Sequence, residues 1–475
     1  MSIDPVDIDA AVKDIERLLA QEQSLSPAMV SAIKVLLLVV KLMGNRLGLN
    51  SRNSSKPPAS DPNRAKKPRH KSQNKPGGQN GRIGKTLQQF ESPDEIQRLT
   101  IDRRTLPVGH YTDAGYESRQ VIEIDISRWV IEYQAQVLLN DAGQRFVAEF
   151  PSQVSRPIQY GNSIKAHCVY LSQFQLLPYN RIADYFADQL GLPISEGSIY
   201  NFNQEASARI GSSGAEAIIK RQLQDCAVLH VDETGINIGG KRHWLHSASN
   251  QQWTYFYPHQ QRGIEAMASA GILPHFTGIL CHDHWTPYYT YQNCQHALCN
   301  AHHLRELERA WEQDGQHWAK AMQALLIDIN TAVSHSAGQL APQQAPVYRK
   351  QYRNILKKGD EECPPPDPNQ RQPGQRGRLK RSKARCLLER LIEYEDDVLR
   401  FMENPWVPFT NNQGENDIRM TKVQQKISGC FRSMDGAQSF CLVRSYISSC
   451  RKQNVTATEA LNLLFQGALP TIFAE

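Results

Sequence analysis

The sequence predicts a mixed α/β protein, built around a sheet with helices packed against it. Apolar runs of strand length are concentrated between residues 223 and 304, and amphipathic helical patterns dominate on both sides of that block. A chain of 475 residues is too long for one compact core, so about three domains are expected. Segments rich in Pro, Ser, Gly and basic residues at 50–85 and 364–385 divide these parts.

The composition is that of a globular protein, with 40% hydrophobic residues and a formal net charge of +6. This mild excess indicates no particular partner, but its distribution is uneven. Between Arg52 and Lys85 there are ten Lys or Arg residues and one acid, Asp61. Such a run is typical either of a solvated flexible segment or of contact with nucleic acid, and both readings stay open.

The ten cysteines form no C-x-x-C pair, and several lie within apolar runs. This pattern favours reduced thiols over a disulfide framework. The longest apolar stretch, Val35 to Val40, is far too short to cross a bilayer. No signal peptide is recognisable, so we expect a soluble, cytoplasmic protein without a membrane partner.

Residues 1–49 are predicted to be helical, with Ser26 as the cap and Pro27 in the first turn. The apolar residues then follow heptad spacing, at Val30, Ile33, Leu37, Val40 and Leu47. This spacing indicates either a short coiled coil that joins two copies of the chain or an amphipathic helix packed on its own chain. Residues 50–90 have no periodic apolar face and are predicted to be a disordered basic linker.

Residues 91–155 are predicted to be a small β-rich module, because RQVIEID and RWVIEYQAQVLL resemble short strands. Residues 156–222 are predicted to be helical. A Gly-Leu-Pro turn at 191–193 separates two helices, and the second begins near Ser195 or Ser198. The pair is typical of a helix-turn-helix that contacts DNA, and equally of ordinary helix packing.

Residues 223–304 contain three strand-like runs joined by tight turns, then a helix, a fourth strand ending at Asp283 and a fifth strand. This order is that of an RNase H-like fold. Residues 305–404 are predicted to be a helical insertion, with a second basic run from Arg376 to Arg385. The core is expected to resume at 405–452, followed by a helical tail at 453–475.

Two acids stand at strand positions where a carboxylate is seldom placed without a partner: Asp232 in HVDETG and Asp283 in CHDHW. A third, Glu415 in NNQGEND, begins a helical run. Carboxylate oxygens are the ligands that Mg²⁺ and Mn²⁺ prefer, and a pair of such ions serves phosphodiester cleavage. If the fold brings the three acids together, they form a divalent-cation site. Otherwise they are ordinary solvated surface.

Arg419, Lys422 and Lys426 follow Glu415 at spacings of four, seven and eleven residues, so all fall on one helix face. Arg432 lies in the turn after that helix. These residues are candidate DNA-phosphate contacts, and the alternative is a surface helix with an i,i+4 ion pair.

Four motifs together resemble the insertion-sequence 66 family of bacterial DDE transposases: HVDETG, DHW, CNAHHLREL and PFTNNQGENDIRMTKVQQKISGCFRS. The N-terminal LGLNSRNSSKPP and NKPGGQNGR segments are also similar to that family. The resemblance implies an RNase H-like catalytic domain and a Mg²⁺ or Mn²⁺ site on the triad Asp232, Asp283 and Glu415. It also implies action on double-stranded DNA, namely terminal repeats and target DNA, by at least a dimer, with possible small accessory proteins. A nuclease or resolvase that cuts without joining, and an inactive DNA-binding regulator, are the alternatives.

The chain departs from the family pattern in one respect, because no cysteine precedes Cys168 where relatives carry a zinc-finger-like module. Zinc is therefore not expected there. Cys294, Cys299, His302 and His303 have spacings that can bind zinc, but they also fit a strand that runs into a helix. Zinc is not expected at that position either. His282 and His284 flank Asp283 and could orient the site or simply pack.

Overall fold

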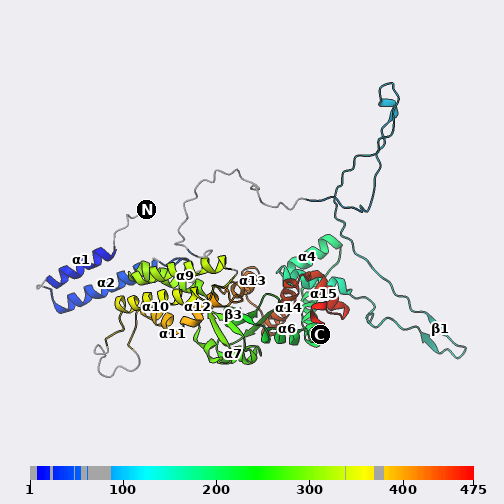
Figure 1. Ribbon diagram of the computed structural model, residues 1–475. Coiled ribbons are helices and arrows are strands. Elements are labelled where there is room, and N and C mark those ends of the chain that lie inside the picture. Colours follow the sequence, from blue (N-terminus) through cyan, green and yellow to red (C-terminus); the bar gives the residue numbers. More distant parts are fainter. Residues whose placement is uncertain are drawn as a thin grey trace. The chain divides into compact units, whose positions relative to one another are not determined.

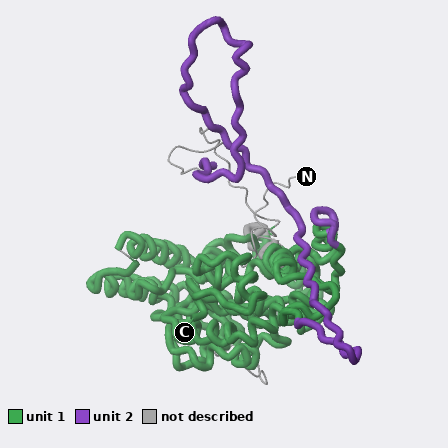
Figure 2. The backbone as a smooth tube through the Cα atoms, turned by 90° about the vertical axis from the view of Figure 1, so that its right-hand side faces the viewer, with its two compact units in different colours: residues 1–64, 150–186, 193–475 green, residues 65–149, 187–192 purple. Residues whose placement is uncertain are grey.

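The fold is described from a computed structural model, which covers residues 8–21, 25–47, 49–54, 61, 87–336, 338–367 and 379–474. The chain divides into two compact units, coloured separately in Figure 2. The first unit comprises residues 1–64, 150–186 and 193–475, and the second comprises residues 65–149 and 187–192. Both helices and strands are present, so the predicted mixed α/β class is confirmed.

The centre of the first unit is a five-stranded sheet with the order β5-β4-β3-β6-β7. The strands are β3 (Val228–Ile238), β4 (Lys241–Ser249), β5 (Thr254–His259), β6 (Ile279–His282) and β7 (Gln295–Leu298). β3, β4 and β5 are antiparallel neighbours, whereas β6 and β7 run parallel to β3. All five strands predicted for residues 223–304 are therefore present, in the predicted chain order.

The hairpin between β3 and β4 turns at Gly239 and Gly240, whose φ angles are +57° and +77°. Two successive positive φ angles match the twist of a two-residue hairpin and are readily adopted by glycine. The nine paired positions of this hairpin run from His230 opposite Ser249 to Ile238 opposite Lys241. The hairpin extends well beyond the part of β3 that pairs with β6.

The outer edge of β5 is covered by helix α14 (Met434–Lys452). The N–H groups of Thr254 and Phe256 donate to the hydroxyl oxygens of Ser449 and Ser445, at 3.1 and 2.9 Å. Alternate strand residues thus match serines four apart on the helix. This arrangement satisfies an edge whose N–H groups would otherwise be free to pair with another strand.

Helix α13 (Asn412–Ser428) packs with α14 on one face of the sheet. Ile236 of β3 and Leu245 of β4 form a core there with Ile418 and Phe440. Both Leu245 and Ile236 are almost completely buried. This packing holds α13 alongside β3. Side chains from the two elements can therefore contribute to one site.

The predicted insertion at 305–404 is helical within the described ranges. Helix α8 (Asn300–Asp314) begins just before it, at the end of β7. The helices that follow are α9 (His317–His335), α10 (Gln344–Glu362), α11 (Lys383–Glu393) and α12 (Glu395–Glu403). They share one apolar core that includes Trp318, Tyr352 and Leu388, and α12 packs on β7. In Figure 1 helices α9 to α12 lie together on one side of β3, with α6 and α14 on the other.

Two arginines in the described part of the second basic run form ion pairs within the helical insertion. Arg385 forms ion pairs with Asp360 and Glu389, and Arg381 also pairs with Glu389. These contacts join α10 to α11. Residues 368–378, which include the start of the run, lie outside the described residues.

The helical region before the sheet contains α3 (Asn162–Val169), the short helix η3 (Tyr170–Phe174), α4 (Tyr179–Leu190), α5 (Glu196–Ser212) and α6 (Ala215–Gln224). Ser195 caps α5 as predicted, and its hydroxyl accepts the N–H of Ser198 at 3.1 Å. Gly191, in the predicted turn, has a φ of +56°. The remaining short elements and the C-terminal helix are α7 (Ile264–Ser269), η4 (Leu273–His275), η5 (Thr286–Thr290), α15 (Ala457–Gln466) and η7 (Thr471–Phe473).

The N-terminal helix is part of a helical pair, α1 (Ile8–Gln21) and α2 (Pro27–Leu47), and Ser26 accepts the N–H of Met29 as the predicted cap. Leu37 of the heptad series is buried, as is Val12 of α1. Val40 of the same series is exposed, together with Leu36. The heptad residues therefore do not form one exposed seam, and α2 packs at least partly on its own chain.

Residues 50–54, at the start of the segment predicted to be a disordered linker, are ordered by contacts with α8. Asn53 is buried, and its side-chain amide donates to Glu312 of α8 at 2.9 Å. Arg52 of the basic run contacts Glu308 of the same helix at 3.4 Å. Residues 50–54 are therefore bound to α8, because their polar groups find partners there. Residues 55–60 and 62–86 lie outside the described residues.

The second unit corrects the prediction of a β-rich module at 91–155. It contains one hairpin, β1 (Val137–Leu139) with β2 (Arg145–Val147), and the short helix η2 (Arg103–Thr105). Residues 119–136 form no strand, although they include the apolar runs that predicted two. An isolated two-stranded hairpin cannot bury an apolar face, and Ile124 and Trp129 are accordingly exposed.

None of the helices in the described ranges is both long enough and apolar enough to cross a membrane. The ten cysteines all fall within these ranges and are free thiols. Eight of them are partly or fully buried, and Cys386 and Cys430 are exposed.

We expect Gly278→Ala to destabilise the sheet, because Gly278 leads directly into β6. A Cβ at this position would lie 2.7 Å from the carbonyl oxygens of both Cys226 and Ala227. Those atoms belong to the backbone and cannot move without disturbing β3. The overpacking is expected to lower the free energy of unfolding by about 1–3 kcal/mol, measured from the urea midpoint.

Gly211→Ala is the matched control for that variant. Gly211 lies near the end of α5, and a Cβ there meets no atom within 4 Å. Alanine at a helical position is expected to raise stability by up to about 1 kcal/mol. Equal urea midpoints for the two variants would contradict the close packing inferred at Gly278.

Candidate active site

Asp232 lies in the middle of β3, partly buried, and its Oδ1 accepts the N–H of Glu233 at 2.8 Å. Burial is the main cause that raises the pKa of Asp232 to about 7. The negative charges of Glu233, Asp283 and Glu415 raise it further. The three acids selected from the sequence therefore lie close enough for their charges to act on one another.

Asp283 comes directly after β6, and its Oδ1 accepts the N–H of Trp285 at 3.0 Å. β6 pairs with β3 in parallel, with His230 opposite Cys281. Continuing the same register by two residues makes Asp232 and Asp283 equivalent positions on neighbouring strands. Parallel pairing thus explains why two acids 51 positions apart in the chain meet.

Glu415 lies in the first turn of α13, with its side chain about one third exposed. Its Oε1 is buried and has no hydrogen-bond partner among the described residues. The nearest basic nitrogen is Nε2 of His302, at 3.9 Å. Burial and Arg305 lower the pKa of His302, so this contact joins a neutral ring to a carboxylate.

Asn411 anchors the start of α13 to β3, although no sequence pattern identifies it. Its side-chain amide donates to the carbonyl oxygen of Val231 at 2.8 Å, and its Oδ1 contacts Nδ1 of His230 at 2.7 Å. Its own N–H donates to Sγ of Cys299 at 3.1 Å. Asn411 therefore ties the residue before Asp232 to the turn that carries Glu415.

The three acids fit a hard divalent cation by their chemistry. They present carboxylate oxygens at one place, their charges repel one another, and Glu415 has an oxygen without a hydrogen-bond partner. A cation such as Mg²⁺ or Mn²⁺ would relieve the repulsion and satisfy that oxygen. The residues that would hold it are Asp232, Asp283 and Glu415.

A second donor set shares Glu415. Sγ of Cys299, a ring nitrogen of His302 and an oxygen of Glu415 all lie within 4.8 Å of one another. The four-residue zinc set considered from the sequence does not form within the described residues. His303 is buried against Asn300, and Cys294 instead contacts the carbonyl oxygen of Tyr291.

The two histidines that flank Asp283 belong to the packing around it. His282 is completely buried, and its Nε2 contacts Nδ1 of His296 at 3.0 Å. Burial lowers the pKa of His282 to about 3, so it stays neutral. His284 lies against the rings of Tyr289 and Tyr394.

The four cations predicted to contact DNA are all exposed. Lys422 donates to the carbonyl oxygen of Gly235 at 2.7 Å. Burial and the charge of Arg242 lower the pKa of Lys422, and the charge of Asp232 only partly offsets this. Arg432 follows Phe431, which pairs with Asn237 and Gly239 at the tip of the hairpin. Arg419 and Lys426 form no ion pair with a described residue.

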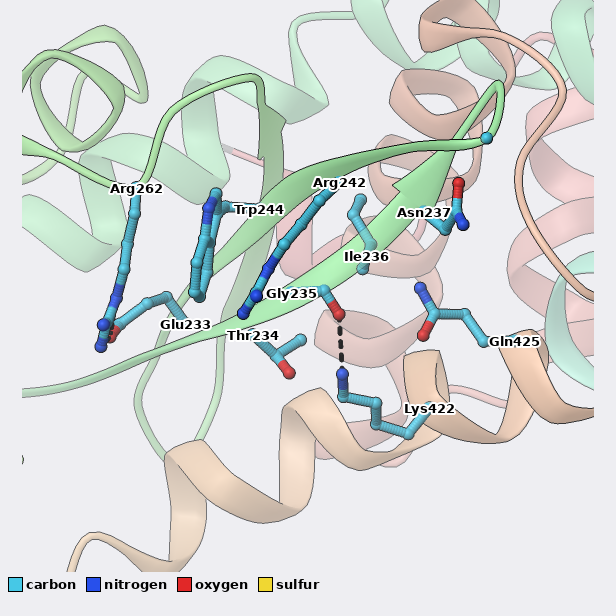
Figure 3. A pocket seen from close by; sticks show the side chains of 11 residues that line it. Glu233, Thr234, Gly235, Ile236, Asn237, Arg242, Trp244, Arg262, Lys422 and Gln425 are labelled. Carbon is cyan, nitrogen blue, oxygen red and sulfur yellow. Dashed lines mark hydrogen bonds and ion pairs between the residues drawn. The ribbon is translucent and has the colours of Figure 1, made fainter.

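A cleft of about 660 Å³ opens beside these residues (Figure 3). We call it the basic cleft. It is lined by Glu233, Thr234, Gly235, Ile236, Asn237, Gly240, Arg242, Trp244, Arg262, Lys422 and Gln425. Most of this lining comes from the part of the β3–β4 hairpin that extends beyond β6.

One wall of the basic cleft is a stack of alternating Arg and Trp side chains. The guanidinium groups of Arg242 and Arg262 lie 4.7 and 4.9 Å from the ring centre of Trp244. Arg262 also lies 4.2 Å from the ring centre of Trp285. We call Arg242, Trp244, Arg262 and Trp285 the Arg–Trp stack. Sequence reasoning missed it, although alternate residues of KRHW on a strand could have suggested that Arg242 and Trp244 share a face.

The fold and site define an α/β protein with carboxylates clustered where two parallel strands and a helix meet, next to a basic cleft. A family model described as "Transposase IS66 family" matches residues 157–439, more than half of the chain. The protein therefore belongs to the IS66 transposase family. Residues 6–88 match a second model, described as a family of unknown function, DUF6444.

A similar curated protein is the "Uncharacterized protein y4jO" of Sinorhizobium fredii (strain NBRC 101917 / NGR234). The two are 35% identical over 66 residues, which are 14% of this chain. The match spans 21% of that relative's length.

Proposed function

We propose that this protein is a DNA transposase. It cleaves phosphodiester bonds at the ends of a mobile element and joins the freed 3′-hydroxyl groups to target DNA. The observation that carries the proposal is the meeting of Asp232, Asp283 and Glu415, from three separate elements, in a member of this family. The basic residues of α13 and the basic cleft beside the acids support a polyanionic substrate.

The sheet order supports an RNase H-like core for this chemistry. Three antiparallel strands are followed by two that run parallel to the first, and the first and fourth strands carry Asp232 and Asp283. The long helical insertion separates this sheet from α13, which returns Glu415 to it. We assign the catalytic core to residues 223–304 and 405–452 on this basis.

The three acids act in their ionised forms. Mg²⁺ or Mn²⁺ held there supplies Lewis-acid activation of the attacking oxygen and stabilisation of the leaving oxygen. Asp232 must lose the proton that its raised pKa favours before it can serve as a ligand. Asn411 holds Glu415 beside β3, so the ligand set is assembled before substrate arrives.

The cations around the site position DNA. Arg419, Lys422, Lys426 and Arg432 contact phosphates on either side of the scissile bond, where each contact orients the strand without reading its sequence. The helix pair α4 and α5 is the candidate for recognising terminal repeats. The exposed apolar residues of α2, which include Leu36 and Val40, are the candidate surface for association of at least two copies. Small accessory proteins are further possible partners.

The proposal is tested with the DNA that flanks the coding region. Purified protein and Mg²⁺ are incubated with labelled fragments of these flanks and a target plasmid. The products are then separated and sequenced. We expect strand breaks at the outer ends of inverted repeats, together with joined molecules in which those ends are linked to plasmid DNA.

The outcomes separate the proposal from its alternatives. Breaks without joined molecules would indicate a nuclease or resolvase. Specific binding of the flanks without breaks, in Mg²⁺ and in Mn²⁺, would indicate a regulator. Either result would overturn the assignment as a transposase.

A further inference from the structure

Arg242 is held in the basic cleft without an acidic partner. No described carboxylate lies within ion-pair distance of its guanidinium group, whereas Arg262 is paired with Glu233. Arg242 is instead fixed by stacking on Trp244, at 4.7 Å. A stacked guanidinium keeps its N–H donors free and in a fixed plane, which suits it to bind an anion.

Gly235 makes room for this arrangement. It lies directly opposite Trp244 in the hairpin register. A Cβ at Gly235 would lie 3.3 Å from Nε and 3.4 Å from Nη2 of Arg242. The absence of a side chain lets the guanidinium lie close to the strand. The carbonyl oxygen of Gly235 accepts a hydrogen bond from the ammonium group of Lys422.

Glu233 fixes the second guanidinium of the stack. Its carboxylate accepts from Nε of Arg262 at 3.0 Å and from the hydroxyl of Tyr288 at 2.5 Å. The side chain of Glu233 is only 2% exposed, so this acid cannot turn toward a ligand in the cleft. Its role is to hold Arg262 between Trp244 and Trp285. Figure 3 shows Glu233 and Trp244 beside Arg262.

The Arg–Trp stack borders the acidic site at its Trp285 end. Trp285 is two residues from Asp283, to whose carboxylate it donates its N–H. At the other end, the charges of Arg242 and Asp232 both act on Lys422. A strand that passes the acids would therefore meet the cleft next.

The cleft carries three cations, Arg242, Arg262 and Lys422, and one acid, Glu233, which is already paired. Both faces of Trp244 are covered by guanidinium groups, as Figure 3 shows, so no face of this ring is open to stack on a nucleobase. Guanidinium and ammonium N–H donors are what remain available. They match phosphate oxygens, not the edge of a particular base.

We propose that the basic cleft binds the phosphodiester backbone of the DNA strand that runs on from the acidic site, with Arg242 as the main contact. Binding there is independent of base sequence. This inference rests on the proposed function for the identity of the polyanion as DNA. It assigns to Glu233, Gly235 and Trp244 the role of positioning residues for the two arginines.

The test is a salt titration of DNA binding, made without divalent metal so that no cleavage occurs. Two double-stranded and two single-stranded oligonucleotides of unrelated sequence are the probes. Arg242→Ala removes the contact, and Gly235→Ala displaces the guanidinium while keeping its charge. Lys350→Ala, on α10 outside the cleft, is the control with the same charge change.

We expect Arg242→Ala to weaken binding roughly tenfold, by the same factor for the two probes of each strand type. The slope of log Kd against log salt should decrease by about 0.9 for double strands and about 0.7 for single strands, the change for one lost phosphate contact. Gly235→Ala should weaken binding in the same way. Lys350→Ala should leave slope and affinity at their wild-type values.

An unchanged slope for both Arg242→Ala and Gly235→Ala, with wild-type circular dichroism, would overturn the inference. A loss confined to one probe sequence would also overturn it, because it would mean that the cleft reads bases. Binding that shifts as expected in a protein that never cleaves would uphold the cleft and contradict the transposase. Cleavage by a protein whose salt slope is unchanged in both variants would uphold the transposase and contradict the cleft. A wild-type protein that binds no DNA would contradict both proposals.

Discussion

Asp232→Asn is expected to reduce metal-dependent strand cleavage by on the order of 10²–10³-fold or more, the loss typical when one charge-stabilising group leaves an active site. Asparagine matches aspartate in size, and its Oδ1 can still accept the N–H of Glu233. It lacks the negative charge with which a carboxylate attracts a hard cation, so it is a weaker ligand. The initial rate of strand cleavage, measured over a range of Mg²⁺ concentrations, gives the effect.

Asp225→Asn is the matched control, because Asp225 is an exposed acid just before β3. It should retain the wild-type cleavage rate. Glu415→Gln should reproduce the loss seen for Asp232→Asn, since both carboxylates belong to one ligand set. Wild-type cleavage by a folded Asp232→Asn protein would show that the three acids are not the catalytic site.

Each of the three acids could be selected because it has a local sequence signal, but only the resemblance to the family implied that the three meet. Asp232 and Asp283 interrupt apolar strand runs, and Glu415 begins a helix whose basic residues repeat at helical spacing. The strand order follows from tight turns and short apolar runs, which are also local. Where local pattern decides the structure, the prediction agrees with what is observed.

The Arg–Trp stack and the anchor at Asn411 could not be predicted in this way. The stack depends on the register that sets Gly235 opposite Trp244, and on Arg262 returning from beyond β5. Asn411 gains its role from contacts with His230 and Cys299, which lie more than 100 positions away. One sequence contains no signal for such pairings.

In two apolar segments the local pattern did not by itself decide the structure, for a common reason. The apolar runs at 119–139 have strand composition, but only Val137–Leu139 form a strand, and the described residues of the second unit provide no further layer against which a sheet could bury the rest. The heptad residues of α2 left both a coiled coil and packing within the chain open, and α1 packs on α2 in the same chain. In both cases the partner of an apolar face decided the structure, and the pattern does not identify the partner.

The clustered acids also carry a cost that the protein bears when no metal is bound. Asp232 has a pKa of about 7 in the folded state, against 3.8 for an ordinary aspartate. Between these two values the folded protein holds a proton that the unfolded chain has lost. The free energy of unfolding therefore falls as the pH rises through this window, and the loss is complete above about pH 7.

Asp232→Asn is therefore expected to stabilise the metal-free protein at pH 8 although it strongly reduces cleavage. Removing the buried charge recovers up to roughly 4 kcal/mol, from a pKa difference of about three units. The gain should appear as a rise in Tm on the order of 4–8 °C at pH 8 in EDTA, shrinking toward zero near pH 4. Thermal unfolding of both proteins across this pH range measures it.

Adding Mg²⁺ should reduce the difference in Tm between Asp232→Asn and the wild-type protein. Bound cation stabilises the wild-type protein by mass action, so its Tm rises with metal concentration at pH 8, whereas the variant lacks a ligand and responds weakly. The two melting temperatures should converge as metal is added. If the variant melts at or below the wild-type temperature at pH 8 in EDTA, the buried carboxylate at Asp232 is compensated by contacts other than a metal. The instability of the empty site would then no longer be an argument that Asp232, Asp283 and Glu415 are arranged to hold a cation.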